Sequence, residues 1–196
     1  MFRALGSYNV LGFVDPHPAA SHILGVPVLG GDDILPRLRT EGVEAAFVAI
    51  GSNRARERIG AELAGMGFAL PTAVHPSALV SPSAEVGNGV VVMARAVVGA
   101  ATVLHELVIV NTGAVLDHDN VVESAAHVAP GCALAGTVRV GARALVGVGS
   151  AVRPGISIGQ DAVIGAGSAV VSDVPSGARV GGAPARPLPP PRSRPS

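Results

Sequence analysis

Two histidines and an aspartate near the middle of the chain could carry out proton transfer. His118 and Asp119 stand together in the stretch NTGAVLDHDN, and His127 follows nine residues later in AHVAPG. An imidazole titrates near neutral pH, so His118 can serve as a general base, and a neighbouring carboxylate would raise its affinity for a proton. Asp117 competes with Asp119 for that second role. The alternative to both is a solvated acidic corner with an incidental histidine.

A six-residue repeat carries these side chains. From Val74 to Val170 every sixth residue is Val, Leu or Ile, at 17 positions out of 17. A period of six fits neither the helix nor the heptad of a coiled coil, and it is typical of a parallel β-helix. We therefore expect these aliphatic side chains to point inward. The residue four positions after each is mostly Ala or Ser, as a narrow interior requires.

The repeat also predicts where the histidines point. His118 is the third residue of its hexad, near a corner, and should face outward. Adjacent residues of a strand point to opposite faces, so Asp119 reaches His118 only if the pair turns that corner. His127 lies half of an 18-residue coil away, on a different side of the same chain. The two histidines can share a site only if neighbouring β-helices pack side by side, as in a trimer.

The residues before the repeat predict a small α/β unit. Tyr8–Asp15 reads as a strand that ends in an acid, and Glu44–Ile50 as a parallel strand buried on both faces. Leu24–Leu29 contains a proline and is expected to be a short edge strand. Asp32 or Asp33 should cap a helix. A second helix is predicted over 54–64, which completes a βαβ-type unit.

The turn before the second helix is a candidate ligand site. Gly51, Ser52 and Asn53 follow the carboxyl end of a predicted buried strand, where α/β sheets bind ligands. The alternative is ordinary turn chemistry, with Asn53 capping the helix. Asp15 ends the preceding strand and is a further candidate for contact with a nucleoside.

Composition excludes several classes of function. The 196 residues have a formal net charge of zero and only 3% aromatic side chains, which argues against nucleic-acid binding. No apolar run reaches the length of a membrane span, and the first residues lack a leader pattern. The single cysteine, Cys132, occupies an inward position of the repeat and reads as core. These features predict a cytoplasmic protein that neither binds nucleic acid nor inserts into a membrane.

The hexads resemble those of the left-handed β-helix acyltransferases. The order of parts, a small Rossmann-like domain followed by hexads with NTGAVLDHDN and AHVAPG, is similar to the bacterial sugar acetyltransferases. That family includes perosamine and bacillosamine N-acetyltransferases and sialic acid O-acetyltransferases. The resemblance covers residues 8–187 and implies a mainly β protein, with a left-handed parallel β-helix preceded by a small, incomplete Rossmann-like α/β domain.

The resemblance assigns roles to individual residues. It implies that His118 is the general base, that Asp119 assists it, and that acetyl-CoA is the co-substrate, with no metal. His127 would contact acetyl-CoA near the thioester, although a polar residue packed at a subunit interface is the alternative. Glycines and one alanine on later coils would lie along the pantetheine arm, although coil geometry also explains them: Gly136, Gly147, Gly149, Ala166 and Gly167. Arg186 could meet a CoA phosphate or be a solvated tail residue.

The same resemblance implies a domain plan. Residues 1–72 would form a partial nucleotide-sugar-binding domain that uses Gly51, Ser52, Asn53 and Asp15, and residues 73–177 the acetyltransferase domain of a homotrimer with active sites between subunits. Residues 178–196 would form a tail with a disordered end, Pro189–Ser196. The family usually opens with a strand and a glycine-rich loop that help to hold the nucleotide-sugar. Here the chain begins at MFRALG, so we expect the first βα unit to be missing.

Three other functions compete with amine acetylation. The first is acetylation of a hydroxyl, as on sialic acid, and sequence does not decide between the two acceptors. The second is a non-catalytic β-helix scaffold. The third is a β-helix carbonic anhydrase with three histidines on zinc, which needs a histidine where Glu123 stands, and the 13- and 9-residue spacing of His105, His118 and His127 does not fit it.

Overall fold

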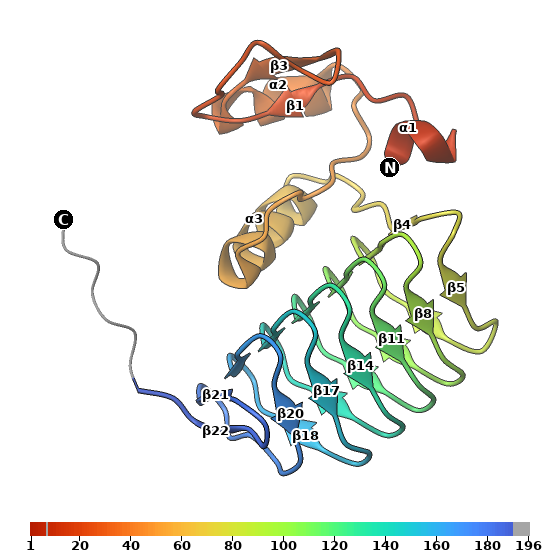
Figure 1. Cartoon of the computed structure of the whole chain (residues 1–196). Coiled ribbons are helices and arrows are strands. Elements are labelled where there is room, and N and C mark those ends of the chain that lie inside the picture. Colours follow the sequence, from red (N-terminus) through yellow and green to blue (C-terminus); the bar gives the residue numbers. More distant parts are fainter. Residues whose placement is uncertain (7, 190–196) are drawn as a thin grey trace.

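The computed structural model describes residues 1–6 and 8–189, and it places most of them in a parallel β-helix (Figure 1). Successive two-residue strands fall in turn on three sheets, and strands 18 residues apart pair in parallel. The eight-stranded sheet holds β4 (Ala73–Val74), β7 (Val91–Val92), β10 (Ile109–Val110), β13 (His127–Val128), β16 (Leu145–Val146), β19 (Val163–Ile164), β21 (Arg179–Gly181) and β22 (Arg186–Pro187). The six-stranded sheet holds β5 (Leu79–Val80), β8 (Val97–Val98), β11 (Val115–Leu116), β14 (Ala133–Leu134), β17 (Ala151–Val152) and β20 (Ala169–Val170). The five-stranded sheet holds β6 (Glu85–Val86), β9 (Val103–Leu104), β12 (Val121–Val122), β15 (Arg139–Val140) and β18 (Ser157–Ile158).

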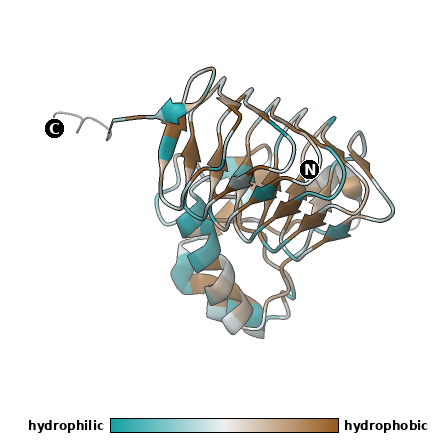
Figure 2. Ribbon diagram, turned by 90° about the horizontal axis from the view of Figure 1, so that it is seen from below, coloured by the Kyte–Doolittle hydropathy of each residue, from teal (hydrophilic) through white to brown (hydrophobic). Residues whose placement is uncertain are grey.

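The hexad prediction is confirmed residue by residue. Every sixth-position aliphatic is the second residue of its strand, and all of them from Val92 onward are buried. The first three, at the open end of the array, are only half-buried. The small residues four positions later fill the same interior, as Ala96 and Ala114 do. Figure 2 shows the outcome as a series of strands that are almost all hydrophobic.

This packing predicts a large stability loss on truncation. Leu134 in β14 is 1% exposed, and its side chain fills the centre of the β-helix. Leu134→Ala removes apolar contacts and leaves a cavity, so the free energy of unfolding should fall by about 2–5 kcal/mol in chemical denaturation. Arg153→Ala, on the exposed surface, is the control and should change it by less than about 0.5 kcal/mol. Equal effects of the two substitutions would contradict the packing described here.

The corners of the coil use the left-handed backbone region. Residues three positions after the buried aliphatics from Val92 to Ile164 have φ near +60°, whether they are glycine, as Gly113, or not, as Asp119 with φ 57°. Such a residue turns the chain from one sheet to the next within a tight corner. Asp119 therefore lies on a corner together with His118, as the sequence required for their contact.

Sheet pairing in the N-terminal region corrects two strand predictions. Of Tyr8–Asp15 only β1 (Phe13–Val14) is a strand, because only Phe13 and Val14 pair with β3 (Val26–Gly30), and in an irregular register. The strand predicted over Leu24–Leu29 does form, as β3, but the prediction that it lies at an edge is wrong. It is the central strand in the order β1-β3-β2. Leu24 and Gly25, both at positive φ, form the turn from β2 (His22–Ile23). The proline is tolerated because Val28 donates to the Ser21 carbonyl, so the backbone nitrogen of Pro27 points away from β2.

The strand predicted over Glu44–Ile50 is not formed, because it lacks neighbouring strands to pair with. Within Glu44–Ile50 only Ala45 pairs, in a single bridge to Ala69, and no strand is formed. A strand buried on both faces requires flanking strands, and the described residues supply only this bridge. Val48 is nevertheless buried, in a cluster with Leu63 of the following helix.

The helices are close to their predicted positions, but the predicted caps are not. The structure has α1 (Phe2–Leu5), a 3-10 turn η1 (Asp32–Ile34), α2 (Leu35–Thr40) and α3 (Asn53–Gly65). Neither Asp32 nor Asp33 caps a helix, because Pro36 sits in the first turn of α2 and moves its start beyond them. Ser52, not Asn53, is the N-cap residue of α3.

Helix α3 docks on one corner of the β-helix and lies between it and the three-stranded sheet (Figure 1). The corner residues between the five- and eight-stranded sheets face α3. Leu107 and Ala125 join its apolar cluster, and Leu107 lies so close to Gly60 that a Cβ there would be 2.6 Å from its Cδ1. Farther along, Arg143 pairs with Glu57 of α3 at 2.8 Å. In the described part of the chain, none of the helices has the length and apolarity to span a bilayer.

Candidate active site

His118 and Asp119 form a hydrogen-bonded pair on an exposed corner between β11 and β12. Nδ1 of His118 lies 2.7 Å from Oδ2 of Asp119, and the His118 side chain is 56% exposed. Asp117 makes a different contact, because its Oδ1 accepts the backbone N–H of His118 at 2.8 Å. The carboxylate that meets the imidazole is thus that of Asp119, which leaves Nε2 of His118 free to accept a proton.

The acidic surroundings make His118 a stronger base. The hydrogen bond that the imidazole donates to Asp119 and, next, the charge of Asp117 raise the pKa of His118 above its ordinary value. Gly136, one coil later, lies under the ring: a Cβ there would be 2.5 Å from Cε1 of His118. A side chain at position 136 would displace the imidazole, so this glycine leaves the space that the His118 ring occupies.

Two buried polar side chains hold the corner from inside. The carbonyl of Asp117 accepts from Oγ1 of Thr102 at 3.0 Å and from Nδ2 of Asn120 at 2.6 Å. Oδ1 of Asn120 in turn accepts the N–H of Val138 on the next coil. Sequence reasoning did not single out these residues. Their signal was available, since both are polar at inward positions of a repeat that is otherwise mostly apolar there.

His127 lies on the outer face of the eight-stranded sheet, opposite the His118 corner. Its Nε2 is 3.0 Å from Nδ2 of Asn111, whose Oδ1 accepts the N–H of Thr112. That second bond fixes the amide, so Nδ2 donates to Nε2 and the ring proton sits on Nδ1. Burial and then the charge of Arg56 lower the pKa of His127 to about 4. His127 is therefore neutral at physiological pH, a donor through Nδ1 rather than a second base.

A groove of about 740 Å³ joins the two parts of the chain at His127. The Gly51–Asn53 turn and Arg54 form one wall, and residues of the eight-stranded sheet and its corners form the other: His127, Ala129, Pro130, Arg143, Leu145, Gly147, Val148, Asp161, Val163, Ile164, Gly165 and Ala166. A volume of this size suits a small-molecule ligand. Arg143 binds Asp161 in a bidentate pair and keeps the pKa of that carboxyl below its usual range.

The structure thus brings some predicted residues together and separates others. Gly51, Ser52, Asn53, His127, Gly147 and Ala166 line one groove. Gly149 and Gly167, both with φ 67°, lie on the corner between the eight- and six-stranded sheets. Asp15 follows β1 and accepts the N–H of His17 instead, and Arg186 lies in β22. Cys132 is buried in the core, as predicted.

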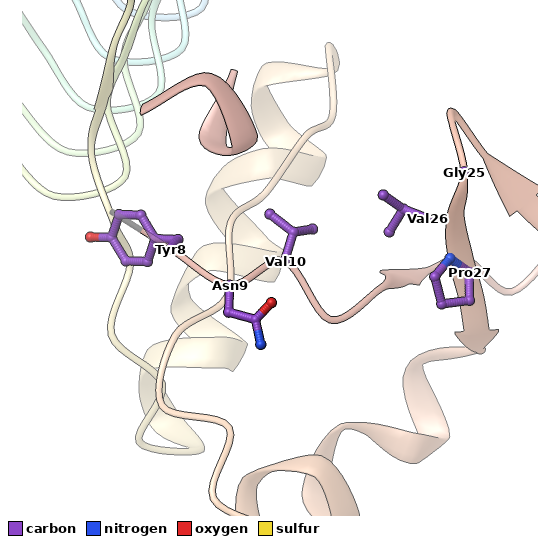
Figure 3. Close-up of a pocket in the computed structure, with 6 residues that line it drawn as sticks. All are labelled: Tyr8, Asn9, Val10, Gly25, Val26 and Pro27. Carbon is purple, nitrogen blue, oxygen red and sulfur yellow. The ribbon is translucent and has the colours of Figure 1, made fainter. Parts of the chain in front are cut away.

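A second, smaller cavity of about 330 Å³ lies in the N-terminal region between residues 8–10 and 25–27 (Figure 3). Tyr8 is its one titratable residue, and no predicted site residue lines it. Among the residues that the structure describes, no three His, Cys, Asp or Glu side chains gather in a way that could hold a metal ion.

Comparison with known proteins identifies the family. The PglD N-terminal domain family matches residues 1–63, and the hexapeptide repeat of succinyl-transferase matches residues 137–172. A structure of PerB from Caulobacter crescentus in complex with CoA and GDP-perosamine is 47% identical, over 96% of this chain and 89% of that one, with a TM-score of 0.92. The chain belongs to the hexapeptide-repeat sugar acetyltransferases. It is therefore an acyltransferase built on a left-handed parallel β-helix, as the resemblance implied.

Two further structures are similar to this chain. The acetyltransferase domain of PglB from Neisseria gonorrhoeae in complex with acetyl coenzyme A is 42% identical, over 95% of this chain and 90% of that one, with a TM-score of 0.91. WeeI from Acinetobacter baumannii is 22% identical, over 95% of this chain and 90% of that one, with a TM-score of 0.84, and shows the shared fold alone.

Proposed function

We propose that this acetyltransferase transfers the acetyl group of acetyl-CoA to the amino group of a nucleotide-linked sugar in bacterial surface-glycan synthesis. The His118–Asp119 pair carries the proposal, because it is an exposed base of raised proton affinity on a corner open to a substrate. The likeness to PerB, which was crystallised with CoA and GDP-perosamine, supports both substrate classes. In this proposal residues 1–72 supply the nucleotide-sugar side and residues 73–177 the catalytic side.

The proposed reaction needs one proton acceptor and one donor. The amine nitrogen attacks the thioester carbonyl carbon while Nε2 of His118 takes the proton that the nitrogen loses. The carbonyl oxygen gains negative charge, and in this proposal Nδ1–H of the neutral His127 donates a hydrogen bond to it. The C–S bond then breaks, and the proton held by His118 passes to the leaving sulfur. The products are the acetamido sugar and CoA, without a covalent enzyme intermediate.

Removing the acidic partner should change the pH profile. The base works only when His118 is neutral, so kcat/KM rises as pH passes its pKa, which Asp119 raises. Asp119→Ala should therefore move the rising limb to lower pH and reduce the plateau by about tenfold, because a weaker base accepts the proton less readily. Asp117→Asn is the comparison and should move the limb less. A larger shift with Asp117→Asn would identify Asp117 as the main partner.

One chain does not bring the base and the groove together, so we propose a homotrimer. The six-stranded sheet has an outer face made only of apolar residues: Leu79, Val97, Val115, Ala133, Ala151 and Ala169. Leu79 is 69% and Val115 42% exposed. The other two faces differ, because α3 docks on the corner beside the eight-stranded sheet and the five-stranded sheet presents Glu85 and Arg139. An uncovered apolar face of this extent is typical of an interface.

Threefold symmetry with this face toward the axis would complete the site. The two corners that border the face would then contact the neighbours. The His118 corner of one subunit would meet the neighbour's corner that carries Gly149 and Gly167, beside the groove with His127. Acetyl-CoA would lie along this contact between two subunits. It would then pass both Gly147 and Ala166 in the groove and Gly149 and Gly167 on the corner beside it. A cytoplasmic location fits the buried, unpaired Cys132.

A direct assay tests the proposal. The purified protein is incubated with acetyl-CoA and a panel of GDP-, UDP- and dTDP-linked amino sugars, each beside its hydroxyl counterpart, and free thiol and product mass are followed. We expect thiol release with at least one amino sugar and a product heavier by one acetyl group. If only hydroxyl acceptors are acetylated, sialic acid included, the enzyme is an O-acetyltransferase and the proposed amine acceptor is wrong. No thiol release with any acceptor would favour the scaffold.

A further inference from the structure

Arg56, in the first turn of α3, is the most buried charged side chain of the docked helix, with 1% of its surface exposed. Its guanidinium is fully occupied by neutral oxygen acceptors rather than by a carboxylate. Nε donates to the Leu107 carbonyl at 2.9 Å, Nη1 to the carbonyls of Ile50 and Gly51 at 3.0 and 3.4 Å, and Nη2 to the Ala125 carbonyl at 2.6 Å. Burial lowers the pKa of Arg56 to about 10, so it stays charged at neutral pH.

The contacts of Arg56 connect the two walls of the groove. Ile50 and Gly51 lead into the Gly51–Asn53 turn on one side. On the other, Nη2 also reaches the Ala126 carbonyl at 3.5 Å, directly before His127. The same nitrogen donates to Oδ1 of Asn53 at 2.8 Å, and Nδ2 of Asn53 donates to the carbonyls of Arg143 and Ala144.

Docking alone does not require this arrangement. Leu107, Ala125 and Leu63 already give α3 an apolar contact with the β-helix, and Arg143 holds Glu57 at the surface. Burying a cation without a carboxylate partner costs free energy. Such a residue is expected where the fixed geometry of the guanidinium donors is needed to hold several acceptors in place. Here the fork spans a turn of the N-terminal domain and the strand that carries His127.

We infer that Arg56 is a positioning residue that sets the Gly51–Asn53 turn at a fixed spacing from His127, and so holds the sugar-nucleotide side of the groove in register with the acetyl-CoA side. This role rests on the proposed function. In this role Arg56 contacts neither substrate. It acts through its hydrogen bonds to Asn53 and to the backbone carbonyls of residues 125 and 126.

Two substitutions at Arg56 separate positioning from simple stability. Arg56→Lys keeps the charge but loses the fork, and Arg56→Met keeps the length but loses the charge and the donors. Arg58→Met is the matched control, because Arg58 lies on the same helix, is exposed, and pairs only with Glu62. Melting temperature, kcat and the KM of each substrate are measured for all three variants. The pH titration of the His127 ring is followed by NMR in the ligand-free protein.

We expect Arg56→Lys to fold and to lower kcat/KM for the nucleotide-linked amino sugar by about 10–100-fold, chiefly through KM, with the KM of acetyl-CoA changed less than about threefold. A purely stabilising residue would lower the melting temperature and leave both KM values unchanged. In Arg56→Met the pKa of His127 should rise, because a positive neighbour is gone. Arg54, Arg143 and Asp161, the other charged groups along the groove, are the same in every variant.

Wild-type KM values in a folded Arg56→Lys, or an unmoved His127 titration in a folded Arg56→Met, would overturn the inference. If Arg56→Met does not fold, the lysine variant decides alone. If the wild type acetylates no amino sugar, the proposed function fails. The ligand-free His127 titration still shows whether Arg56 controls that side of the groove.

Discussion

His118→Ala should reduce kcat by about 10²–10⁴-fold and leave the fold and the oligomeric state intact. The side chain is 56% exposed, is hydrogen-bonded to Asp119 and lies over Gly136, so its loss creates no core cavity. In the proposed mechanism, what disappears is the group that takes the amine proton. The measurement is steady-state thiol release from acetyl-CoA with the best acceptor of the panel, together with light scattering and thermal denaturation.

A control and a rescue sharpen this result. His105→Ala removes another exposed corner histidine, on the preceding coil, and should change kcat less than about twofold. Added imidazole should restore part of the activity of His118→Ala, because the vacated space over Gly136 is open to solvent. A His118→Ala protein that keeps more than a tenth of wild-type kcat would exclude His118 as the base.

Val115→Glu should separate the subunits and abolish turnover, although it leaves His118, Asp119 and His127 unchanged. Val115 lies in β11 at the middle of the apolar outer face, between Val97 and Ala133 on the paired strands. A buried carboxylate without a partner would cost several kcal/mol at an interface, more than a small apolar contact provides. Size-exclusion chromatography with light scattering reports assembly, and the thiol assay reports activity.

The matched control places the same charge on another face. Val121 lies on the five-stranded sheet, where Arg139 is its cross-strand neighbour. Val121→Glu should therefore leave both assembly and turnover near wild type. Mixing His118→Ala with His127→Ala subunits gives an independent test. If each site takes one histidine from each of two neighbours, random assembly restores about a quarter of the sites. A monomeric Val115→Glu protein with full turnover would show that one chain contains the whole site.

The accuracy of the sequence predictions follows the range of the interactions involved. Val92 or Leu116 must face inward because the hexad repeats one local geometry, and each coil presents the same small interior. Asp119 could be preferred to Asp117 as soon as the pair was placed on a corner. In the N-terminal region the propensity of 44–50 for a strand was real, yet a strand exists only with neighbours, and there the pairing is reduced to Ala45 with Ala69.

By itself, the sequence determined the β-helix, its register, the corner with His118 and Asp119, and the separation of that corner from His127. Each of these depends on spacing along the chain, which a repeat converts directly into position. Only the tertiary structure revealed Asn111 beside His127, Thr102 and Asn120 beneath the Asp117 carbonyl, and Arg56 between the groove walls. For Arg56 the physical reason is that its bonds join residues as many as 70 positions apart, and that its partners are set by how α3 docks on the coil. The bonds of Asn111, Thr102 and Asn120 lie within the coil, and their partners are set by side-chain direction, which the spacing of the repeat does not specify.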